Sequence, residues 1–171
     1  REHAFCWKLK RSPHLQSLYI APGNAGTLQL GINVDLSISD FISIGNFCIE
    51  KKINLVLVGP EEPLVKGIYD YFKNHNELKN IIITGPGSEG AQLEGSKAFS
   101  KMLMKKYGIP TAAYQEFSKE NYEEGVTYLQ KHSLPIVLKA DGLAAGKGVI
   151  ICHDNSTALK IFDEILLASK F

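Results

Sequence analysis

The sequence predicts an α/β protein in which a doubly wound parallel sheet is followed by a smaller α+β part. Nearly continuous apolar runs at 54–58 and 81–84 alternate with segments of helical periodicity, which is typical of strands buried on both faces of a parallel sheet. Residues 108–110, Gly-Ile-Pro, end a long helical pattern and interrupt this alternation. The runs 136–139 and 149–152 are joined only by a glycine-rich segment, which favours an antiparallel pair.

The first part of the chain supplies helices and strands in turn. Apolar residues recur at helical spacing in four segments, which are 3–10, 41–48, 63–72 and 91–107. Three short apolar runs are predicted as strands, namely 18–21, 54–58 and 81–84. Asp40 provides an N-cap for the second helix, and Pro63 lies at the start of the third, where its missing N–H is tolerated. The polar stretch 22–33 is expected to be a loop.

The second part has a different rhythm. Residues 112–117 are predicted as a strand, 120–131 as an amphipathic helix and 156–167 as a final helix. We therefore expect one domain over 1–108 and a second over 109–171.

Composition excludes few classes of protein, but it bears on the expected partners and cellular compartment. With 44% hydrophobic and 22% charged residues among 171, the chain has an ordinary globular composition. Its net charge of +1 gives no electrostatic reason to expect nucleic acid or a membrane surface as partner. Cys6, Cys48 and Cys152 form no CxxC pair, so we expect reduced, buried cysteines in a cytoplasmic protein. None of the histidines has a metal-site spacing.

The next observations concern targeting segments and the two ends of the sequence. There is no signal peptide and no apolar run long enough to span a membrane. The chain opens on Arg1 without Met and stops at Phe171, shortly after a helical pattern. We expect it to be cut at both ends.

The glycine-rich segment between the antiparallel strands reads LKADGLAAGKGVII over 138–151. It differs from a Walker A loop, because the glycine spacing is one residue short and a glycine stands where Ser or Thr is required. Its glycines still allow backbone N–H groups to approach a polyanion, and Lys139 and Lys147 supply positive charge. We interpret the segment as a loop that covers a bound phosphate; the alternative is a glycine-rich hairpin with solvated lysines.

A second glycine pattern, GPGSEG over 85–90, formally satisfies the GxGxxG motif of dinucleotide-binding proteins. That fingerprint requires an acidic residue at the end of a second strand roughly 20 residues on. Here that region is a predicted helix with Lys105 and Lys106. A dinucleotide-binding oxidoreductase is an alternative that rests on this motif alone.

Glycine-bearing turns follow three of the predicted parallel strands. They are 22–26, 59–61 and 85–87. Open α/β sheets bind ligands at the carboxyl ends of their strands, so a substrate cleft is expected there. Glu61 is a candidate partner for a sugar hydroxyl or an amine, or simply an acidic residue at a helix N-terminus. Gly95, inside a predicted helix and near Lys97, costs about 1 kcal/mol relative to Ala, which indicates a close approach there.

Six motifs in sequence order resemble the phosphoribosylamine–glycine ligase family, also called glycinamide ribonucleotide synthetase. They are REHA at 1–4, PGNAG at 22–26, VGPE at 58–61 followed by Pro63-Leu64, LEGSK at 93–97, GIPT at 108–111 and the segment 139–149. The resemblance covers essentially the whole chain. It implies an ATP-grasp ligase of purine biosynthesis that uses ATP and Mg²⁺ to join glycine to 5-phosphoribosylamine. The expected products, formed through a glycyl phosphate, are glycinamide ribonucleotide, ADP and phosphate.

By that resemblance, the two parts of the chain have different roles. The first is a Rossmann-like substrate domain, and the second is the small subdomain of an ATP-grasp fold. The ATP side comprises Lys97, Lys139, Gly142, Leu143, Ala144, Ala145, Gly146, Lys147, Gly148 and Val149. The side that receives phosphoribosylamine comprises Arg1, Glu2, Pro22, Gly23, Asn24, Gly59, Pro60 and Glu61.

The sequence also departs from the family pattern. The family's first strand and Gly-rich turn precede the residues that match Arg1, so we expect the first sheet to lack a central strand. The second ATP-grasp subdomain, with the catalytic residues, the magnesium ligands and a glycine-binding arginine, is expected beyond Phe171. No metal ligand is therefore assigned, and the chain alone is expected to be inactive. Another ATP-grasp carboxylate–amine ligase and a non-catalytic nucleotide-binding module are the alternatives, and the oligomeric state is left open between monomer and dimer.

Overall fold

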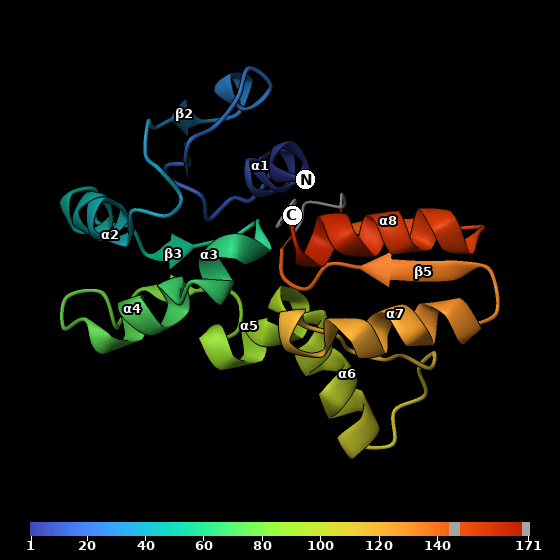
Figure 1. Ribbon diagram of the computed structural model, residues 1–171. Helices are drawn as coiled ribbons and strands as arrows, with labels where there is room; N and C mark the ends of the chain where they lie inside the picture. Colours follow the sequence, from blue (N-terminus) through green and yellow to red (C-terminus); the bar gives the residue numbers. More distant parts are fainter. Residues whose placement is uncertain (144–147, 169–171) are drawn as a thin grey trace. The chain divides into compact units, whose positions relative to one another are not determined.

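A computed structural model describes residues 1–143 and 148–168. The chain forms two compact units, Arg1–Ala91 and Gln92–Phe171, and each is described by itself (Figure 1). In the part of the chain that the structure describes, no helix is long and apolar enough to cross a membrane.

Unit 1 combines helices with two pairs of parallel strands. Its helices are α1 (Glu2–Leu9), α2 (Phe41–Glu50), α3 (Glu61–Val65) and α4 (Ile68–Asn74). Its strands are β1 (Tyr19–Ile20), β2 (Ile32–Asn33), β3 (Leu55–Val56) and β4 (Ile82–Ile83). β1 pairs with β2 and β3 pairs with β4, both in parallel. The parallel pairing agrees with the predicted α/β class, although the strands form two separate pairs.

The core of unit 1 is formed by side chains of α2, α4 and β4 and of the segment between α4 and β4. Phe72 and Leu78 are fully buried, and each contributes about 1.5–3 kcal/mol by removing its side chain from water. They pack with Cys48, Ile68, Ile81 and Ile83. The predicted N-cap is confirmed, because the Asp40 carboxylate accepts from the Ser43 N–H at 3.0 Å.

Two expectations for unit 1 are wrong in detail. The helix expected over 63–72 is divided into α3 and α4 at Gly67, whose φ of +91° suits glycine. The loop expected over 22–33 contains a 3-10 turn, η1 (Thr27–Gln29), and the strand β2. Backbone bonds hold β2 beside β1: the N–H of Ile32 in β2 donates to the carbonyl of Leu18, just before β1, at 2.9 Å, and the N–H of Val34, just after β2, donates to the carbonyl of Ile20 in β1 at 2.8 Å. The two residues of β2 are too few to show a strand periodicity in the sequence.

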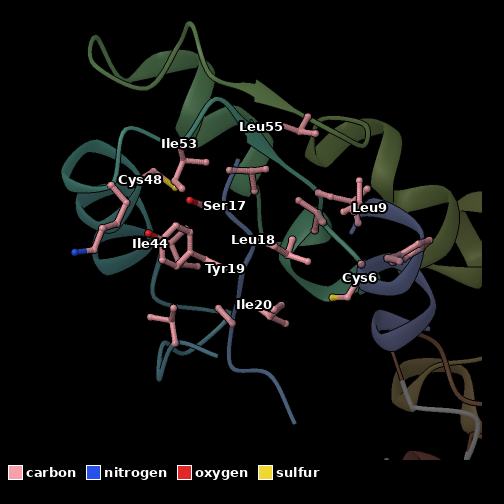
Figure 2. A pocket seen from close by; sticks show the side chains of 18 of the residues that line it. Cys6, Leu9, Ser17, Leu18, Tyr19, Ile20, Ile44, Cys48, Ile53 and Leu55 are labelled. Atoms are coloured by element: carbon pink, nitrogen blue, oxygen red, sulfur yellow. The ribbon is translucent and has the colours of Figure 1, made fainter. Parts of the chain in front are cut away.

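Unit 1 also holds an apolar cavity of about 620 Å³ (Figure 2). Side chains from α1, from the β1 strand and from residues 53–57 around β3 line it; they include Cys6, Leu9, Leu18, Tyr19, Ile53 and Leu55. The cavity therefore contacts both parallel pairs. As predicted, Cys6 and Cys48 are buried free thiols, and burial raises the pKa of Cys48 to about 11.

Unit 2 is built around an antiparallel hairpin. Its elements are the end of α5 (Ser88–Gly95), α6 (Lys97–Lys106), a 3-10 turn η2 (Lys119–Asn121), α7 (Tyr122–Lys131), β5 (Ile136–Lys139), β6 (Val149–Cys152) and α8 (Asn155–Leu166). The antiparallel pairing of β5 with β6 is confirmed. α7 and α8 pack against each other and share a core with the hairpin, which consists of Leu129, Ile136, Cys152, Ala158 and Phe162.

The long helix expected over 91–107 is broken in two. Ser96 leaves helical geometry, with φ −133° and ψ 121°, and its hydroxyl accepts from the Phe99 N–H at 3.1 Å as the N-cap of α6. The boundary expected near residues 108–111 lies inside unit 2, because the first turn of α6 is hydrogen-bonded to Asp141 of the same unit.

The strand expected over 112–117 is also absent from this described segment. A lysine holds the segment instead: the Lys101 ammonium donates to the Thr111 hydroxyl at 2.7 Å and to the Ala112 carbonyl at 2.9 Å. The start of this segment is thus bound by a lysine side chain and not by the backbone hydrogen bonds of a strand pair.

Candidate functional site

The nucleotide side predicted from the sequence lies in unit 2, on the hairpin. Lys139, the last residue of β5, lies directly opposite Val149, the first residue of β6. Both are exposed, and so are Val137 and Ile151 on the same face. Because side chains alternate along a strand, the other face is the one that packs against α7 and α8. The hairpin therefore presents an open apolar face with a lysine at its loop end.

The two residues that follow β5, the buried Ala140 and the exposed Asp141, connect the hairpin to helix α6. The Ala140 N–H donates to the Gly148 carbonyl at 2.8 Å, which closes the base of the loop. Asp141 then turns toward α6: its carboxylate accepts from the Lys97 N–H at 2.6 Å, from the Ala98 N–H at 3.3 Å and from the Ser96 hydroxyl at 3.0 Å. The first N–H groups of a helix have no partner within the helix, and Asp141 supplies one.

Electrostatics at Asp141 reflect this arrangement. Burial alone would raise the pKa of its carboxyl, but the hydrogen bonds from Ser96 and from the backbone N–H groups of Ala98, Lys97 and Gly142 outweigh burial and lower it. Asp141 is therefore an anion in the folded protein at neutral pH, stabilised by N–H and O–H donors.

Lys97 is the second lysine predicted for the nucleotide. Its ammonium donates to the Gly142 carbonyl at 2.8 Å, so the side chain reaches the first glycine of the loop. Gly142 has φ +89°, a conformation that glycine adopts readily, and Leu143 is exposed. Gly95, the last residue of α5, is buried. The structure thus joins Lys97 to the loop start; Ala144, Ala145, Gly146 and Lys147 lie outside the described residues.

The predicted substrate side lies in unit 1, around the start of α1. Arg1 forms ion pairs with Glu2 and Glu61, each at 3.3 Å, although all three side chains are about half exposed. Gly59 lies against α1: a Cβ there would be 3.3 Å from a Glu2 carboxylate oxygen. Pro60 is the N-cap residue of α3. The structure therefore brings the predicted residues of 1–2 and 59–61 together at the carboxyl end of β3.

The second predicted turn, Pro22-Gly23-Asn24, follows β1 and is fastened by its own side chains. The Asn24 amide oxygen accepts from the N–H groups of Gly26 and Thr27 at 2.9 and 3.1 Å. Gly26 in turn approaches α1, since a Cβ there would be 3.1 Å from the His3 ring. Through residues 1–3, the start of α1 thus contacts both turns of the predicted substrate side.

Sequence reasoning missed two polar residues that hold this turn. The fully buried Thr27 hydroxyl accepts from the Asn24 N–H at 2.8 Å and lies 2.8 Å from the Asn33 side-chain oxygen. Asn33 also donates to the Asn24 carbonyl at 2.9 Å and packs closely under Gly23. A Thr three residues after an Asn is the one local signal in the sequence; the contribution of Asn33 depends on the pairing of β2 with β1.

The GPGSEG turn is closed by an acidic residue of unit 1. Asp70, from α4, accepts from the Ser88 N–H at 2.7 Å. A Cβ on Gly87 would lie 2.7 Å from the same carboxylate. A carboxylate therefore occupies the helix N-terminus where a dinucleotide phosphate would bind, which argues against the dinucleotide interpretation.

Metal ligands do not gather in the described ranges, residues 1–143 and 148–168. No three His, Cys, Asp or Glu side chains there are placed to hold an ion.

Comparison with known proteins gives the family of the chain. The family model described as phosphoribosylglycinamide synthetase, N domain, matches residues 1–94. The model for the ATP-grasp (A) domain of the same synthetase matches residues 95–171.

Curated relatives agree along the full chain. A phosphoribosylamine–glycine ligase of Clostridium acetobutylicum is 45% identical over 171 residues, which are all of this chain and 40% of that protein. The Escherichia coli K12 protein of the same name is 43% identical over the whole chain and 39% of its own length. A bifunctional purine biosynthetic protein of Schizosaccharomyces pombe is 42% identical, with 22% of its length covered. The chain thus spans about two-fifths or less of these relatives.

Solved structures support the same fold. A phosphoribosylamine–glycine ligase from Thermotoga maritima matches with a TM-score of 0.66 and 29% identity, over 95% of this chain and 36% of that one. The biotin carboxylase domain of Hydrogenobacter thermophilus 2-oxoglutarate carboxylase matches with a TM-score of 0.68 and 19% identity, over 95% of this chain and 38% of that one; this likeness concerns the fold alone. Because the two family models together account for every residue, the chain belongs to the phosphoribosylglycinamide synthetase family.

Proposed function

We propose that this chain forms part of an ATP-dependent carbon–nitrogen ligase that joins glycine to 5-phosphoribosylamine. Membership of the family and the printed names of the curated relatives support the reaction. Within the structure, the observation that carries the proposal is the position of Lys97, whose ammonium is held 2.8 Å from the Gly142 carbonyl at the start of the glycine loop.

The nucleotide is proposed to bind on the open face of the hairpin. Ligand sites are mostly apolar with a few well-placed polar groups, and Val137, Val149 and Ile151 with Lys139 have that character. Lys97 and Lys139 would contact the phosphates from α6 and from β5. In the described residues neither lysine has an ion-pair partner, so both positive charges remain available. The Hydrogenobacter domain of like fold was solved with MgADP, which fits this proposal.

The chemistry consists of two displacements. The γ-phosphoryl group of ATP passes to a carboxylate oxygen of glycine, and ADP leaves with the broken P–O bond. The nitrogen of phosphoribosylamine then attacks the glycyl carbonyl carbon, phosphate leaves, and the new amide nitrogen loses a proton. Lys97 and Lys139 would stabilise the charge on the phosphoryl oxygens.

The phosphoribosylamine side is proposed to lie at the start of α1. Arg1 offers a planar cationic group suited to a phosphate or ribose oxygen, and the exposed Glu61 offers an acceptor for an amine or a hydroxyl. Because these ion pairs are exposed, they stabilise the fold little and can be exchanged for contacts to a substrate.

Magnesium is implied by the family, but the described residues do not provide a site for it. The acidic residue of the glycine-rich segment, Asp141, already accepts three bonds from residues 96–98. We therefore assign no metal ligand to this chain and no step of the reaction to a metal.

The test is ADP release by a complete ligase that contains this chain, assayed with ATP, glycine and phosphoribosylamine. Release that requires both substrates is expected, and Lys97→Met should reduce kcat/KM for ATP about 100-fold if one phosphate-binding cation contributes roughly 3 kcal/mol. Lys101→Met is the matched control, since Lys101 lies on the same helix but binds the segment at Thr111 and should leave kcat/KM within about twofold.

The alternatives give other outcomes. ADP release that does not depend on glycine would favour another ATP-grasp ligase. ATP binding without turnover, unaffected by Lys97→Met, would favour a non-catalytic nucleotide-binding module.

A further inference from the structure

Asp141 and Lys97 lie 44 residues apart in sequence and are joined by bonds that leave the lysine charge intact. The carboxylate accepts from the backbone N–H of Lys97 and from the Ser96 hydroxyl. The Lys97 ammonium points elsewhere, to the carbonyl of Gly142. Within the described ranges it forms no ion pair with Asp141 or any other acid.

We propose that Asp141 is a positioning residue for Lys97. Its carboxylate fixes the first turn of α6 against the base of the glycine loop, and this sets the direction in which the Lys97 side chain leaves the helix. The importance of that direction for catalysis rests on the proposed function, in which Lys97 binds a phosphate of ATP. The positioning itself requires no nucleotide.

A carboxylate suits this task for an electrostatic reason. The first N–H groups of a helix carry partial positive charge, and an anion that accepts from them forms charge-assisted bonds. The negative charge of Asp141 is directed at the N–H groups of residues 97 and 98. A direct ion pair between Asp141 and the Lys97 ammonium would instead compete with a phosphate for the same cation. The observed arrangement holds the lysine without neutralising it.

Asp154 provides the matched comparison within unit 2. It is the N-cap of α8, and it accepts from the Thr157 N–H at 2.7 Å and from the hydroxyls of Ser156 and Thr157 at 2.6 and 2.8 Å. All of these bonds lie at the start of its own helix. Removal of Asp154 therefore deletes a carboxylate cap without touching Lys97 or the loop.

The experiment observes Lys97 in the 171-residue chain. Lysines are acetylated with an N-hydroxysuccinimide ester, and the rate at each lysine is followed by peptide mass spectrometry. Hydrogen exchange is measured in parallel at the amides of Lys97 and Ala98. Wild type is compared with Asp141→Ala, Asp141→Asn and the control Asp154→Ala.

In Asp141→Ala, the amides of Lys97 and Ala98 should exchange about tenfold faster, because a charge-assisted bond of this kind corresponds to roughly one decade in an opening equilibrium. Acetylation of Lys97 should accelerate about fivefold for the same reason, while Lys101 keeps its rate. Asp141→Asn retains an oxygen that can accept from the Lys97 N–H but loses the negative charge, so both rates should lie between those of wild type and Asp141→Ala, about threefold above wild type. In Asp154→Ala the rate at Lys97 should not change.

Two results would overturn the proposal. One is an equal acetylation rate of Lys97 in wild type and in both Asp141 variants. The other is the same acceleration in Asp154→Ala, because Asp141 would then contribute only general stability. Neither result depends on nucleotide, so it is read separately from a failure of the proposed function.

In a complete ligase that contains the chain, the expected signature is a split in the kinetic constants. Asp141→Ala should raise KM for ATP about tenfold while KM for glycine stays unchanged. A lower kcat with every KM unchanged would indicate a loss of folded enzyme and would contradict the positioning role.

Discussion

Two glycine-bearing turns of this protein use a carboxylate in opposite ways. At residues 85–90 the carboxylate comes from outside the turn: Asp70 of α4 accepts a hydrogen bond from the N–H of Ser88 at the start of α5. After β5 the carboxylate belongs to the turn itself: Asp141 accepts a hydrogen bond from the N–H of Lys97 at the start of α6. The first turn is thereby closed to an external anion. The second keeps a lysine, Lys97, at its first glycine.

The comparison shows why the two sequence motifs differ in value. GPGSEG matches a known phosphate-binding pattern, yet its helix N-terminus is already filled by an acidic side chain. LKADGLAAGKGV matches no common pattern, yet two lysines without ion-pair partners in the described residues stand at its base. The placement of charge around a turn is thus more informative than the spacing of its glycines.

The largest expected effect is at Gly85, which has φ +114° and would place a Cβ 2.6 Å from Leu64. Gly85→Ala should lower the free energy of unfolding of unit 1 by about 3 kcal/mol, from backbone strain together with overpacking. Urea unfolding followed by Trp7 fluorescence measures it, since Trp7 is the chain's one tryptophan. Gly67→Ala is the control: φ is +91° but no side-chain atom lies closer than 3.7 Å, so the loss should be only about 1–2 kcal/mol. Equal losses would contradict the tight packing at Gly85.

Asp70→Ala should have the next largest effect. It leaves the Ser88 N–H without its carboxylate and should destabilise unit 1 by about 1–2 kcal/mol, measured by the same urea titration. Asp35→Ala, at an exposed acidic residue of unit 1, should change the free energy by less than about 0.5 kcal/mol. Wild-type chain should not bind NADH in a fluorescence titration; saturable binding would restore the dinucleotide interpretation of this turn.

Gly142→Ala should cost less than Gly85→Ala. Gly142 has φ +89°, but no atom of the described residues lies within 4 Å of a Cβ built there, so among these residues only the left-handed conformation opposes the change. We expect a loss of about 1 kcal/mol in the opening free energy of the β5–β6 hairpin, measured by amide hydrogen exchange. A loss as large as that of Gly85→Ala would show that the second turn is packed as tightly as the first.

The smallest expected effect concerns the stability of α8 in acid, where Asp154 caps the N-terminus of that helix alone. Hydrogen bonds from Ser156 and Thr157 lower the pKa of Asp154 from 3.8 to about 2. A lowered carboxyl pKa stabilises the folded state above the unfolded pKa, and this contribution is lost as pH falls through the folded value. Exchange protection of α8 should therefore decline between pH 4 and 2 in wild type. In Asp154→Ala the part of that decline due to this carboxyl should disappear, and an unchanged decline would contradict the assignment.

Elements with clear periodicity were predictable. The antiparallel hairpin, the helix over residues 2–9 and the apolar strands at 55–56 and 82–83 all follow from apolar spacing. The breaks at Gly67 and Ser96 were missed because periodicity continues across them, although both residues carry local signals, a flexible backbone and an N-cap hydroxyl.

The site was predictable only in part. Glycines and lysines indicated a phosphate loop, and Lys97 indeed reaches it. The part of Asp141 was not predictable, because its partners are 43 to 45 residues away and only the folded unit brings them together. The support of Asn24 by Asn33 depends in the same way on a strand pair of two residues each. The ligand-binding roles of the predicted residues stay predictions.

The cavity beside β1 and β3 bears on how the chain behaves in solution at high concentration. Among the described residues, β1 pairs only with β2 and β3 pairs only with β4. Side chains from both β1 and β3 line the cavity (Figure 2). Unpaired strand edges beside apolar surface attract the edges of other molecules. Solubility and self-association, measured by light scattering as a function of concentration, are therefore where this feature of unit 1 should be most evident.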